Sequence, residues 1–380
     1  MDSSRIQYDR WLSQPSLDAS LRAELSAMAD DAHAIDNAFG CELTFGTGGL
    51  RGILGAGTNR MNVHVVRRAA QAVADYLSGT ALPKRAAIGY DSRIGSARFA
   101  RETAAVFAAN GIEAYIYPRL EPVPALSFAV RALSCGVGVC ITASHNPPQY
   151  NGYKAYWEDG AQLSPEAAEA VTGYIRPLPY AGAPVMAEDE AKQKGLLQII
   201  GAKEVDDDYI AMIRSLSVCP ELLQAEGKNL RIVYTPLHGS GNLPVRRNLA
   251  KAGFKNVFIV KEQELPDSSF STVDYPNPED TKVFTLARKL AAEVNADVLI
   301  GTDPDCDRMG AMVKDSEGNF VALTGNMVGA LATDYILSQR KEQGRLPANG
   351  VVVKTIVSTE MITPICRAYG VGKIDVLTGF

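Results

Sequence analysis

Cysteine and histidine are scarce in this sequence, and an excess of positive charge is missing. Its 380 residues include six cysteines and four histidines, with no CxxC pair and no Cys/His set at zinc spacing. A disulfide framework and a zinc site are therefore not indicated. With 38 basic and 43 acidic residues, the formal net charge is −5. Because nucleic-acid binding needs a net basic face, we expect no nucleic-acid partner, and any phosphate contact must be local.

Long apolar runs are also missing. The opening MDSSRIQYDRW has neither the apolar core nor the basic lead of a signal peptide. No later segment offers the roughly 20 consecutive apolar residues that a membrane helix needs. We therefore expect a cytoplasmic protein without a membrane contact. The hydrophobic content of 46% over 380 residues is enough for two or three domains.

Short apolar runs alternate with helical segments in three successive passes. The runs lie at 86–91, 112–118 and 137–142 in the first pass, at 230–235, 256–261 and 296–301 in the second, and at 350–357 and 373–377 in the third. Such alternation predicts α/β units whose sheets are mainly parallel. Before the first pass, apolar residues recur at steps of three and four from Leu17 to Phe39, which predicts one amphipathic helix.

We therefore expect tandem, related three-layer α/β domains with mixed, mostly parallel sheets. Residues 1–200 would form the first domain with its N-terminal helix, 201–320 the second, and 321–380 part of a third. The Pro/Gly-rich stretch GYIRPLPYAGAP and the charged EDEAKQKG after it indicate a connector between the first two. The last apolar run ends close to Phe380 without a closing helix, which predicts an incomplete third domain.

Ser144 follows the apolar run VGVCIT, at the start of a turn that contains Pro147 and Pro148. Ligands of open α/β sheets bind beyond the carboxyl ends of the strands, so a serine here is a candidate nucleophile. The alternative is a turn serine that caps a proline-fixed bend. A serine hydrolase is disfavoured because GxSxG is absent, and because His145 is too close in sequence to act as a triad base.

Three aspartates, Asp303, Asp305 and Asp307, alternate along a loop after the run ADVLIG. Oxygen ligands at this spacing suit Mg²⁺ or Mn²⁺, and Mg²⁺ prefers a few carboxylates together with a phosphate oxygen. A solvated acidic turn is the alternative, but the mutual repulsion of three acids favours a bound cation. An EF-hand is excluded, since Arg308 and Lys314 stand where it needs glycine and glutamate.

Other positions are weaker candidates on their own. The loop GTGGLRG at 46–52 combines glycine flexibility with Arg51, which suits approach to an anion, but it is not a Walker loop. Lys154 is close enough in sequence to Ser144 to share its crevice, and a partly desolvated lysine can lose its charge and move protons. A surface lysine is the alternative. For Arg93 and His238, which also follow apolar runs, structural roles are favoured.

Four motifs in this order, GTGGLRG, TASHNPPQYNGYK, TPLHGSG and GTDPDCDR, resemble those of the α-D-phosphohexomutase superfamily. The resemblance is to the phosphoglucomutase/phosphomannomutase branch, which includes phosphopentomutases, and it runs from about residue 40 to the end. It implies an isomerase of carbohydrate metabolism in which Ser144 is a phosphoserine. Asp303, Asp305, Asp307 and the seryl phosphate would bind one Mg²⁺.

The resemblance further implies that Arg51 and Arg308 attend the reacting phosphoryl group. His145 and Lys154 would contact the substrate and assist proton transfer, and Asp307 and Thr378 are further candidate substrate contacts. The phosphoserine would pass its phosphoryl group to a hexose 1-phosphate, and glucose 1,6-bisphosphate would turn over in the cleft before a phosphate returns to Ser144. The net reaction interconverts hexose 1-phosphate and hexose 6-phosphate, with glucose as the expected sugar and mannose or pentose phosphates as alternatives.

The sequence departs from the family pattern in two respects. Members have four domains, with a GEESG-like sugar loop late in the third, and neither that loop nor a fourth domain is found here. An alternative from another class is therefore a truncated, non-catalytic phosphosugar-binding module. Cys306 also stands where many relatives have glycine or alanine. Its side chain is expected to point away from the flanking carboxylates, so metal binding should survive it. Oligomeric state is not indicated.

Overall fold

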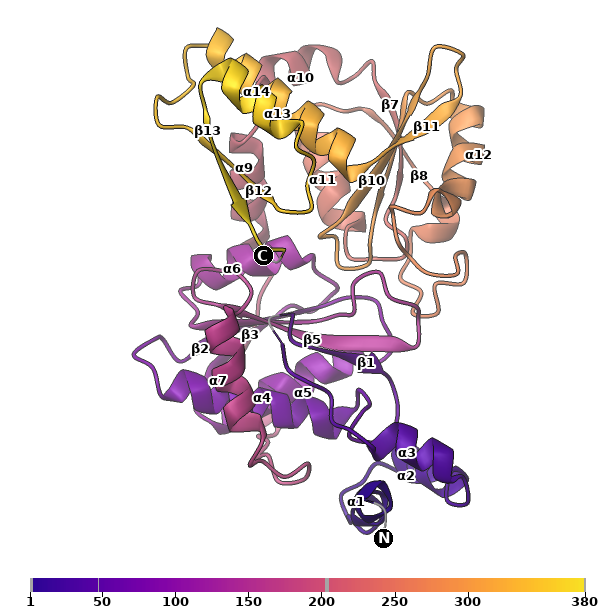
Figure 1. Cartoon of the computed structure of the whole chain (residues 1–380), viewed down its shortest axis with the longest axis vertical. Helices are drawn as coiled ribbons and strands as arrows, with labels where there is room; N and C mark the ends of the chain where they lie inside the picture. Colours follow the sequence, from indigo (N-terminus) through magenta and orange to yellow (C-terminus); the bar gives the residue numbers. More distant parts are fainter. Residues whose placement is uncertain (1–2, 47, 202–204, 379–380) are drawn as a thin grey trace.

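The computed structural model describes residues 3–46, 48–201 and 205–378. Figure 1 shows two α/β lobes stacked along the long axis, with the N-terminal helices at the far end of the first lobe. The last helices, in yellow, lie beside the second lobe, and the final strand points toward the first lobe. Within the described residues, no helix is long and apolar enough to cross a bilayer.

The N-terminal segment forms α1 (Ser3–Leu12), α2 (Ala19–Ala27) and α3 (Ala32–Phe39). The prediction of one helix over 17–39 is therefore wrong, because the chain turns after α2. The Asp31 side chain accepts a hydrogen bond from Ala34 N at 2.9 Å and so caps a new helix. The apolar side chains of all three helices, including Trp11, Leu25 and Phe39, pack in one small core.

The first sheet has the strand order β1-β5-β4-β2-β3-β6. Its strands are β1 (Leu50–Ile53), β2 (Arg85–Tyr90), β3 (Glu113–Ile116), β4 (Val137–Ile141), β5 (Tyr150–Trp157) and β6 (Leu197–Ile199). The pairs of β2 with β3, β2 with β4 and β3 with β6 are parallel. In contrast, β5 runs antiparallel to both β4 and β1.

Helices cover both faces of this sheet. They are α4 (Val63–Ser78), α5 (Ser96–Ala109), α6 (Val123–Ala132), α7 (Pro165–Ile175) and α8 (Glu188–Gln193). Ile88 of β2 packs in one core with α4, α5 and α7, whereas the preceding residue along the strand, Ala87, packs with α6. Successive side chains of a strand point to opposite faces, so the lobe has three layers.

The second sheet repeats this arrangement, with the order β11-β10-β9-β7-β8. Its strands are β7 (Arg231–Thr235), β8 (Asn256–Ile259), β9 (Val298–Thr302), β10 (Met309–Lys314) and β11 (Phe320–Leu323). The pairs of β7 with β8 and β9 are parallel, and β10 runs antiparallel to β9 and β11. Around this sheet lie α9 (Asp207–Ser215), α10 (Pro220–Glu226), α11 (Asn242–Ala252) and α12 (Thr285–Val294), with short 3-10 turns η2 (Lys261–Gln263) and η3 (Thr281–Phe284).

The third unit is small. It comprises α13 (Gly325–Glu342), β12 (Val351–Thr355), α14 (Ile362–Tyr369) and β13 (Gly372–Val376), with the two strands paired in parallel. The expected α/β class with mixed, mostly parallel sheets is thus confirmed. The strands β5, β10 and β11 were not predicted. The prediction relied on apolar runs that alternate with helical segments, and no helix lies directly before any of these three strands.

The topology brings two strand ends together. The chain leaves β2 through α5 on one face of the sheet and reaches β4 through α6 on the other. Such a switch between neighbouring strands opens a crevice beyond their carboxyl ends. The loop after β2 and the loop that contains Ser144 therefore start side by side.

Candidate active site

The turn after β4 holds Ser144 in a strained and buried position. Its φ angle is +52°, which non-glycine residues adopt rarely, and its exposed fraction is 3%. Ser144 N donates a hydrogen bond to Thr142 Oγ1 at 2.8 Å, which helps to fix this conformation. The hydroxyl is thus held at the carboxyl end of the strand, where the sequence analysis placed it.

Arg93 clamps this turn from the neighbouring loop. Its guanidinium donates to the carbonyl oxygens of Ser144 and Asn146, each at 2.5 Å, and to those of Pro147 and Tyr150 at 2.9 and 3.0 Å. Arg93 Nε lies 3.3 Å from Asp91 Oδ2. The favoured structural role of Arg93 agrees with this arrangement, because these contacts are to backbone oxygens and to its charge partner.

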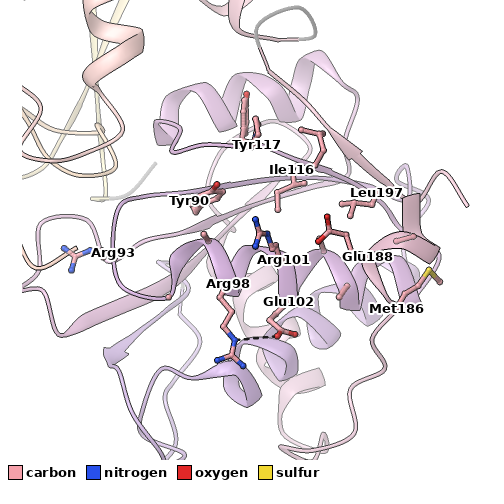
Figure 2. A pocket seen from close by; sticks show the side chains of 17 residues that line it. Tyr90, Arg93, Arg98, Arg101, Glu102, Ile116, Tyr117, Met186, Glu188 and Leu197 are labelled. Carbon is pink, nitrogen blue, oxygen red and sulfur yellow. Dashed lines mark ion pairs between the residues drawn. The ribbon is translucent and has the colours of Figure 1, made fainter. Parts of the chain in front are cut away.

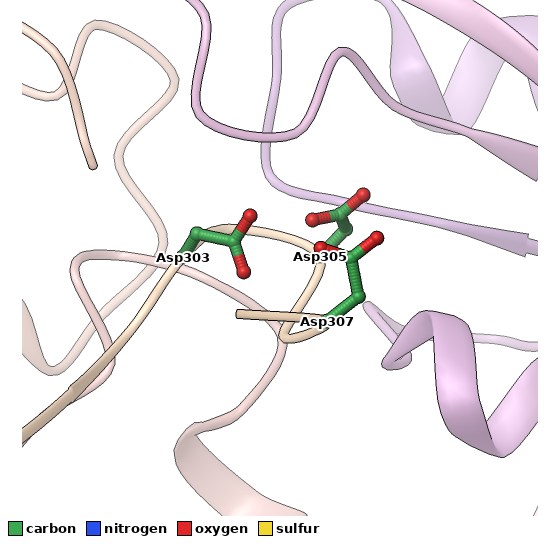
Figure 3. A group of neighbouring side chains, drawn as sticks. All are labelled: Asp303, Asp305 and Asp307. Carbon is green, nitrogen blue, oxygen red and sulfur yellow. The ribbon is translucent and has the colours of Figure 1, made fainter. Parts of the chain in front are cut away.

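The acidic loop after β9 brings Asp303, Asp305 and Asp307 together. One carboxylate oxygen from each lies within 4.8 Å of the others, and Figure 3 shows the three side chains around one point. Asp303 and Asp305 are fully buried. Burial, followed by the charges of Asp305 and Asp307, raises the pKa of Asp303 well above its usual value.

The motif TPLHGSG contacts the backbone of the acidic loop at Pro304. Ser240 donates to Pro304 O through its backbone N at 2.8 Å and its Oγ at 2.9 Å. A Cβ on Gly239 would lie 2.5 Å from Pro304 Cα, so only glycine allows this approach. A Cβ on Gly241 would lie 2.8 Å from Cys306 Sγ, which places the thiol on the Gly241 side of the loop.

His238 in the same motif has a structural place. Its ring nitrogens bind Leu265 O at 3.0 Å and Thr272 Oγ1 at 2.8 Å. Both ring nitrogens are therefore engaged within its own lobe, as the favoured structural role requires.

The serine turn and the acidic loop meet across the two lobes. Ser144 Oγ donates to Asp303 Oδ2 at 2.8 Å, and Thr142 Oγ1 lies 3.1 Å from Asp305 Oδ2. Val123 N, at the start of α6, donates to Asp305 O at 2.9 Å. The candidate nucleophile and the candidate metal ligands therefore form one site.

Lys154 reaches the same site from β5. Its Nζ lies 2.8 Å from Asp305 Oδ2 and 2.9 Å from Asp307 Oδ2, and its exposed fraction is 4%. Burial alone would favour the neutral amine, but the two carboxylates hold the pKa of Lys154 well above its usual value. The alternative of a surface lysine is therefore wrong, because Lys154 is buried. The two carboxylates favour its charged form, and its part in proton transfer stays a prediction.

His145 lies on the open side of the turn. Burial, then the charges of Arg308 and Arg51, lower its pKa to about 4, so the ring is neutral at neutral pH. Its Nδ1 is 3.2 Å from Ser144 Oγ. Arg51 Nη1 donates to Asn146 Oδ1 at 2.9 Å, and Arg308 N donates to Asp303 Oδ1 at 3.0 Å. The Arg308 guanidinium itself pairs with Glu279 at 3.4 Å, and both arginines lie near enough to His145 for their charges to lower its pKa.

Thr378 is the one candidate that the described contacts do not join to the others. It is exposed just after β13, and within residues 3–46, 48–201 and 205–378 no hydrogen bond links it to the serine turn or the acidic loop. Thr47 of the GTGGLRG motif, and Gly379 and Phe380 after Thr378, lie outside the described residues.

The acidic loop fits a divalent cation. Asp305 Oδ1 and Asp307 Oδ1 are buried, and among the described residues neither has a hydrogen-bond partner. Buried carboxylate oxygens without partners are costly, and coordination by a hard cation would satisfy them. The Lys154 ammonium contacts only the other oxygen of each group.

Sequence reasoning missed two members of the site. Thr142 links Asp91 Oδ2, at 2.7 Å, to the acidic loop, and Asp91 also accepts hydrogen bonds from Arg93 N and Ser96 Oγ. Thr142 is the first residue of the motif TASHNPPQYNGYK, and its position directly after β4 could have indicated that it belongs to the site. Asp91 ends a strand-like run beside Arg93, but nothing in the sequence indicates that β2 and β4 are neighbours.

The fold and the site together define a class: tandem α/β domains in which a serine of the first faces an acidic loop of the second. The family profile described as "Phosphoglucomutase/phosphomannomutase, alpha/beta/alpha domain I" matches residues 42–178, and that for domain II matches residues 207–318. The chain belongs to this phosphoglucomutase/phosphomannomutase family of the α-D-phosphohexomutase superfamily.

Similar proteins agree with this assignment. A phosphoglucomutase of Staphylococcus epidermidis is 38% identical over 339 residues, covering 89% of this chain and 60% of the relative. One from Staphylococcus aureus is 36% identical over 344 residues, covering 90% and 60%. The chain thus spans 60% of the length of these curated relatives.

Solved structures show the same fold. A putative phosphomannomutase from Thermus thermophilus superposes with a TM-score of 0.70 at 24% identity, covering 89% of this chain and 70% of that one. A phosphoglucomutase/phosphomannomutase family protein from Burkholderia thailandensis gives a TM-score of 0.65 at 20% identity, covering 89% and 66%.

Proposed function

We propose that this chain carries the phosphoserine and metal site of a phosphosugar mutase, which interconverts hexose 1-phosphate and hexose 6-phosphate. The contact that carries the proposal is the hydrogen bond of 2.8 Å from Ser144 Oγ to Asp303 Oδ2 across the lobes. This contact supports the proposal because the Ser144 hydroxyl lies in the same loop cluster as Asp305 and Asp307, each of which has one buried oxygen without a partner among the described residues. The phosphoglucomutases among the similar proteins support the same reaction class.

Phosphoryl transfer needs charge neutralisation and in-line positioning more than covalent chemistry. Asp303, Asp305 and Asp307, with the seryl phosphate, would hold Mg²⁺, which when bound neutralises charge on the phosphoryl oxygens. The chain itself supplies two further cations, Arg51 and Arg308, on the open side of the turn. The Arg93 clamp keeps Ser144 in its position during the reaction.

Phosphoryl transfer also requires a proton to leave the attacking hydroxyl, and His145 and Lys154 are the candidates for this step. In the proposed sequence, the bond from phosphorus to Ser144 Oγ breaks as a sugar hydroxyl attacks, and that hydroxyl loses its proton. The neutral His145 ring can accept a hydrogen bond from the incoming hydroxyl, whereas Lys154 in the present geometry holds its proton between Asp305 and Asp307. We therefore assign His145 to proton transfer and Lys154 to charge balance, and Lys154 would become a proton donor only after leaving the two carboxylates.

Glucose phosphates are the proposed substrates, with glucose 1,6-bisphosphate as the activating intermediate. Mannose and pentose phosphates are the alternatives within the class. Rates on glucose 1-phosphate, mannose 1-phosphate and ribose 1-phosphate with the same protein would rank them, and a higher rate with mannose or ribose phosphate would overturn the choice of glucose.

The test of the proposal is the mass of the intact chain after exposure to glucose 1,6-bisphosphate and Mg²⁺. We expect one added phosphate, located on Ser144 by peptide mapping and absent in Ser144→Ala. The exposed Ser13→Ala variant is the matched control and should still be modified. A phosphate found elsewhere would refute the nucleophile assignment. Binding of the bisphosphate with Ser144 unmodified would instead favour a phosphosugar-binding module.

A further inference from the structure

A cavity in the first lobe has a lining distinct from the serine turn and the acidic loop. It has a volume of about 700 Å³ and is enclosed by α5, the segment leading into α8, and the carboxyl ends of β2, β3 and β6. Among the described residues that line it, none belongs to the 142–150 turn or the 303–308 loop. This size is in the range of pockets for small organic ligands.

One wall of this cavity is apolar, and a backbone hydrogen bond fixes the position of the connector that borders it. Ile116 of β3 and the alternate residues Leu197 and Ile199 of β6 line it, opposite Ala105 of α5. Met186 N donates to Ala105 O at 3.0 Å, which fixes the connector across α5. The small alanine side chains on α5 leave the space that larger residues would fill.

The positively charged side chain of Arg101 also lines this cavity. Figure 2 shows the Arg101 guanidinium between Tyr90 and Glu188. In the described part of the chain, no carboxylate lies within ion-pairing distance of Arg101, whereas Glu188 pairs with Lys192 at 2.6 Å. Glu102, on the same helix, pairs with Arg67 at 2.7 Å.

Arg101 is exposed and makes no ion pair among the described residues, so its guanidinium is available to an anion at the cavity. Its charge acts on Glu188, whose pKa is lowered first by the hydrogen bond from Lys192 and to a smaller extent by Arg101. It also acts on Tyr90: burial raises the pKa of this phenol, and the nearby Arg101 opposes the rise. The guanidinium, a planar fork of donors, suits bidentate binding of a phosphate or carboxylate.

We infer that this cavity, defined by the apolar wall and Arg101, binds a small organic anion that has a flat apolar body and one phosphate or carboxylate group. The body would lie against Ile116, Leu197 and Ile199, and the anionic group would pair with Arg101. Arg93 and Gly95 line one end of the same cavity, so its occupant would touch the loop whose Arg93 clamps the serine turn. The inference does not depend on the proposed mutase reaction.

The test is calorimetric titration of the full chain with 1-naphthyl phosphate and with 1-naphthoate. We expect saturable binding of at least one probe, weakened roughly tenfold or more by Arg101→Ala, since a charge-assisted pair is lost. Arg176→Ala, an exposed arginine outside the cavity, should bind within about twofold of the unmodified chain. Tighter binding of naphthyl phosphate would identify a phosphate ester, and tighter binding of naphthoate a carboxylate; either supports the site.

A second variant tests the apolar wall. Ala105→Leu fills the cavity from α5 without changing a charge, and it too should weaken binding. The inference fails if neither probe saturates at millimolar concentration, or if Arg101→Ala binds as tightly as the unmodified chain. It also fails if Arg51→Ala abolishes binding while Arg101→Ala does not, because the probe would then occupy the serine site.

Discussion

At the scale of single residues, Lys154 and a divalent cation would use the same carboxylates. The ammonium lies 2.8 and 2.9 Å from one oxygen each of Asp305 and Asp307. Removing it leaves two buried charges without a partner, which is costly. We therefore expect Lys154→Met to lower the free energy of unfolding of the metal-free chain by about 3 kcal/mol.

The same variant should bind Mg²⁺ roughly tenfold more tightly, because the positive charge of the ammonium no longer repels the cation. Isothermal titration with Mg²⁺ and urea unfolding with and without Mg²⁺ would measure both effects. Lys192→Met, on an exposed helix, is the control and should change neither. Weaker Mg²⁺ binding in Lys154→Met would contradict this account, since the lysine would then support metal binding rather than oppose it.

His145 makes the stability depend on pH in a defined direction. Its folded pKa of about 4 lies below the usual 6.5, so the folded state resists protonation. The stabilisation is fully present above pH 6.5 and is lost as the pH falls toward 4. Thermal unfolding of His145→Gln should lose less stability over this interval than the unmodified chain. The exposed His33→Gln should follow the unmodified curve; parallel curves for all three proteins would exclude His145 as the cause.

At the scale of elements, the segment that joins β3 to α6 carries a buried acid. Burial, then the charge of Asp206, raises the pKa of Glu121 to about 8, although Arg119 opposes the rise. Arg119 contacts both carboxylates, with its Nε 3.6 Å from Glu121 Oε2. Because Asp206 immediately precedes α9, this cluster connects the first lobe to the start of the second.

The sign of the pH effect at Glu121 is opposite to that at His145. The folded protein keeps a proton that the unfolded chain loses above pH 4.5, so stability falls as the pH rises from 4.5 to about 8. Glu121→Gln should flatten this fall and raise the free energy of unfolding at pH 8 by roughly 1–3 kcal/mol. Urea unfolding at several pH values measures it, with the exposed Glu169→Gln as control. A destabilised Glu121→Gln at pH 8 would show that the ionised carboxylate is the native form.

At the scale of the whole molecule, exposed apolar side chains gather in the third unit. Leu331, Val353, Val357 and Leu377 are each exposed by 60% or more. An apolar groove of about 340 Å³ lies between α13 and the face of β9–β11, lined among others by Ile300 and Leu331. Exposed apolar side chains and an open apolar groove are prone to association, because burial of such surface is favourable.

We therefore expect the chain to self-associate as its concentration rises. Sedimentation velocity should show an increasing weight-average mass, and a double variant, Leu331→Lys with Val353→Lys, should reduce it, because charge at these positions opposes burial. Leu216→Lys is the matched control, since Leu216 is 63% exposed but lies on the connector after α9. A concentration-independent monomer mass for the unmodified chain would contradict the prediction.

Several features of this protein follow from the sequence alone. The alternation of apolar runs and helical segments determines the α/β class, because buried parallel strands need continuous apolar residues and crossover helices. The order of four motifs indicates the family, and their glycines, prolines and alternating acids locate Ser144 and the acidic loop. These are local properties, since turn geometry and carboxylate spacing are encoded in a few neighbouring residues.

The tertiary structure alone decided how these pieces act on one another. The charge of Lys154 depends on carboxylates about 150 residues away that only lobe packing brings to it. The role of Arg93 depends on four carbonyl groups in the segment that follows β4. This segment lies next to Arg93 because β2 pairs with β4. No periodicity in the chain reports such pairings, because protonation and hydrogen bonding are set by the groups that fill the space around a side chain, and not by those next to it in sequence.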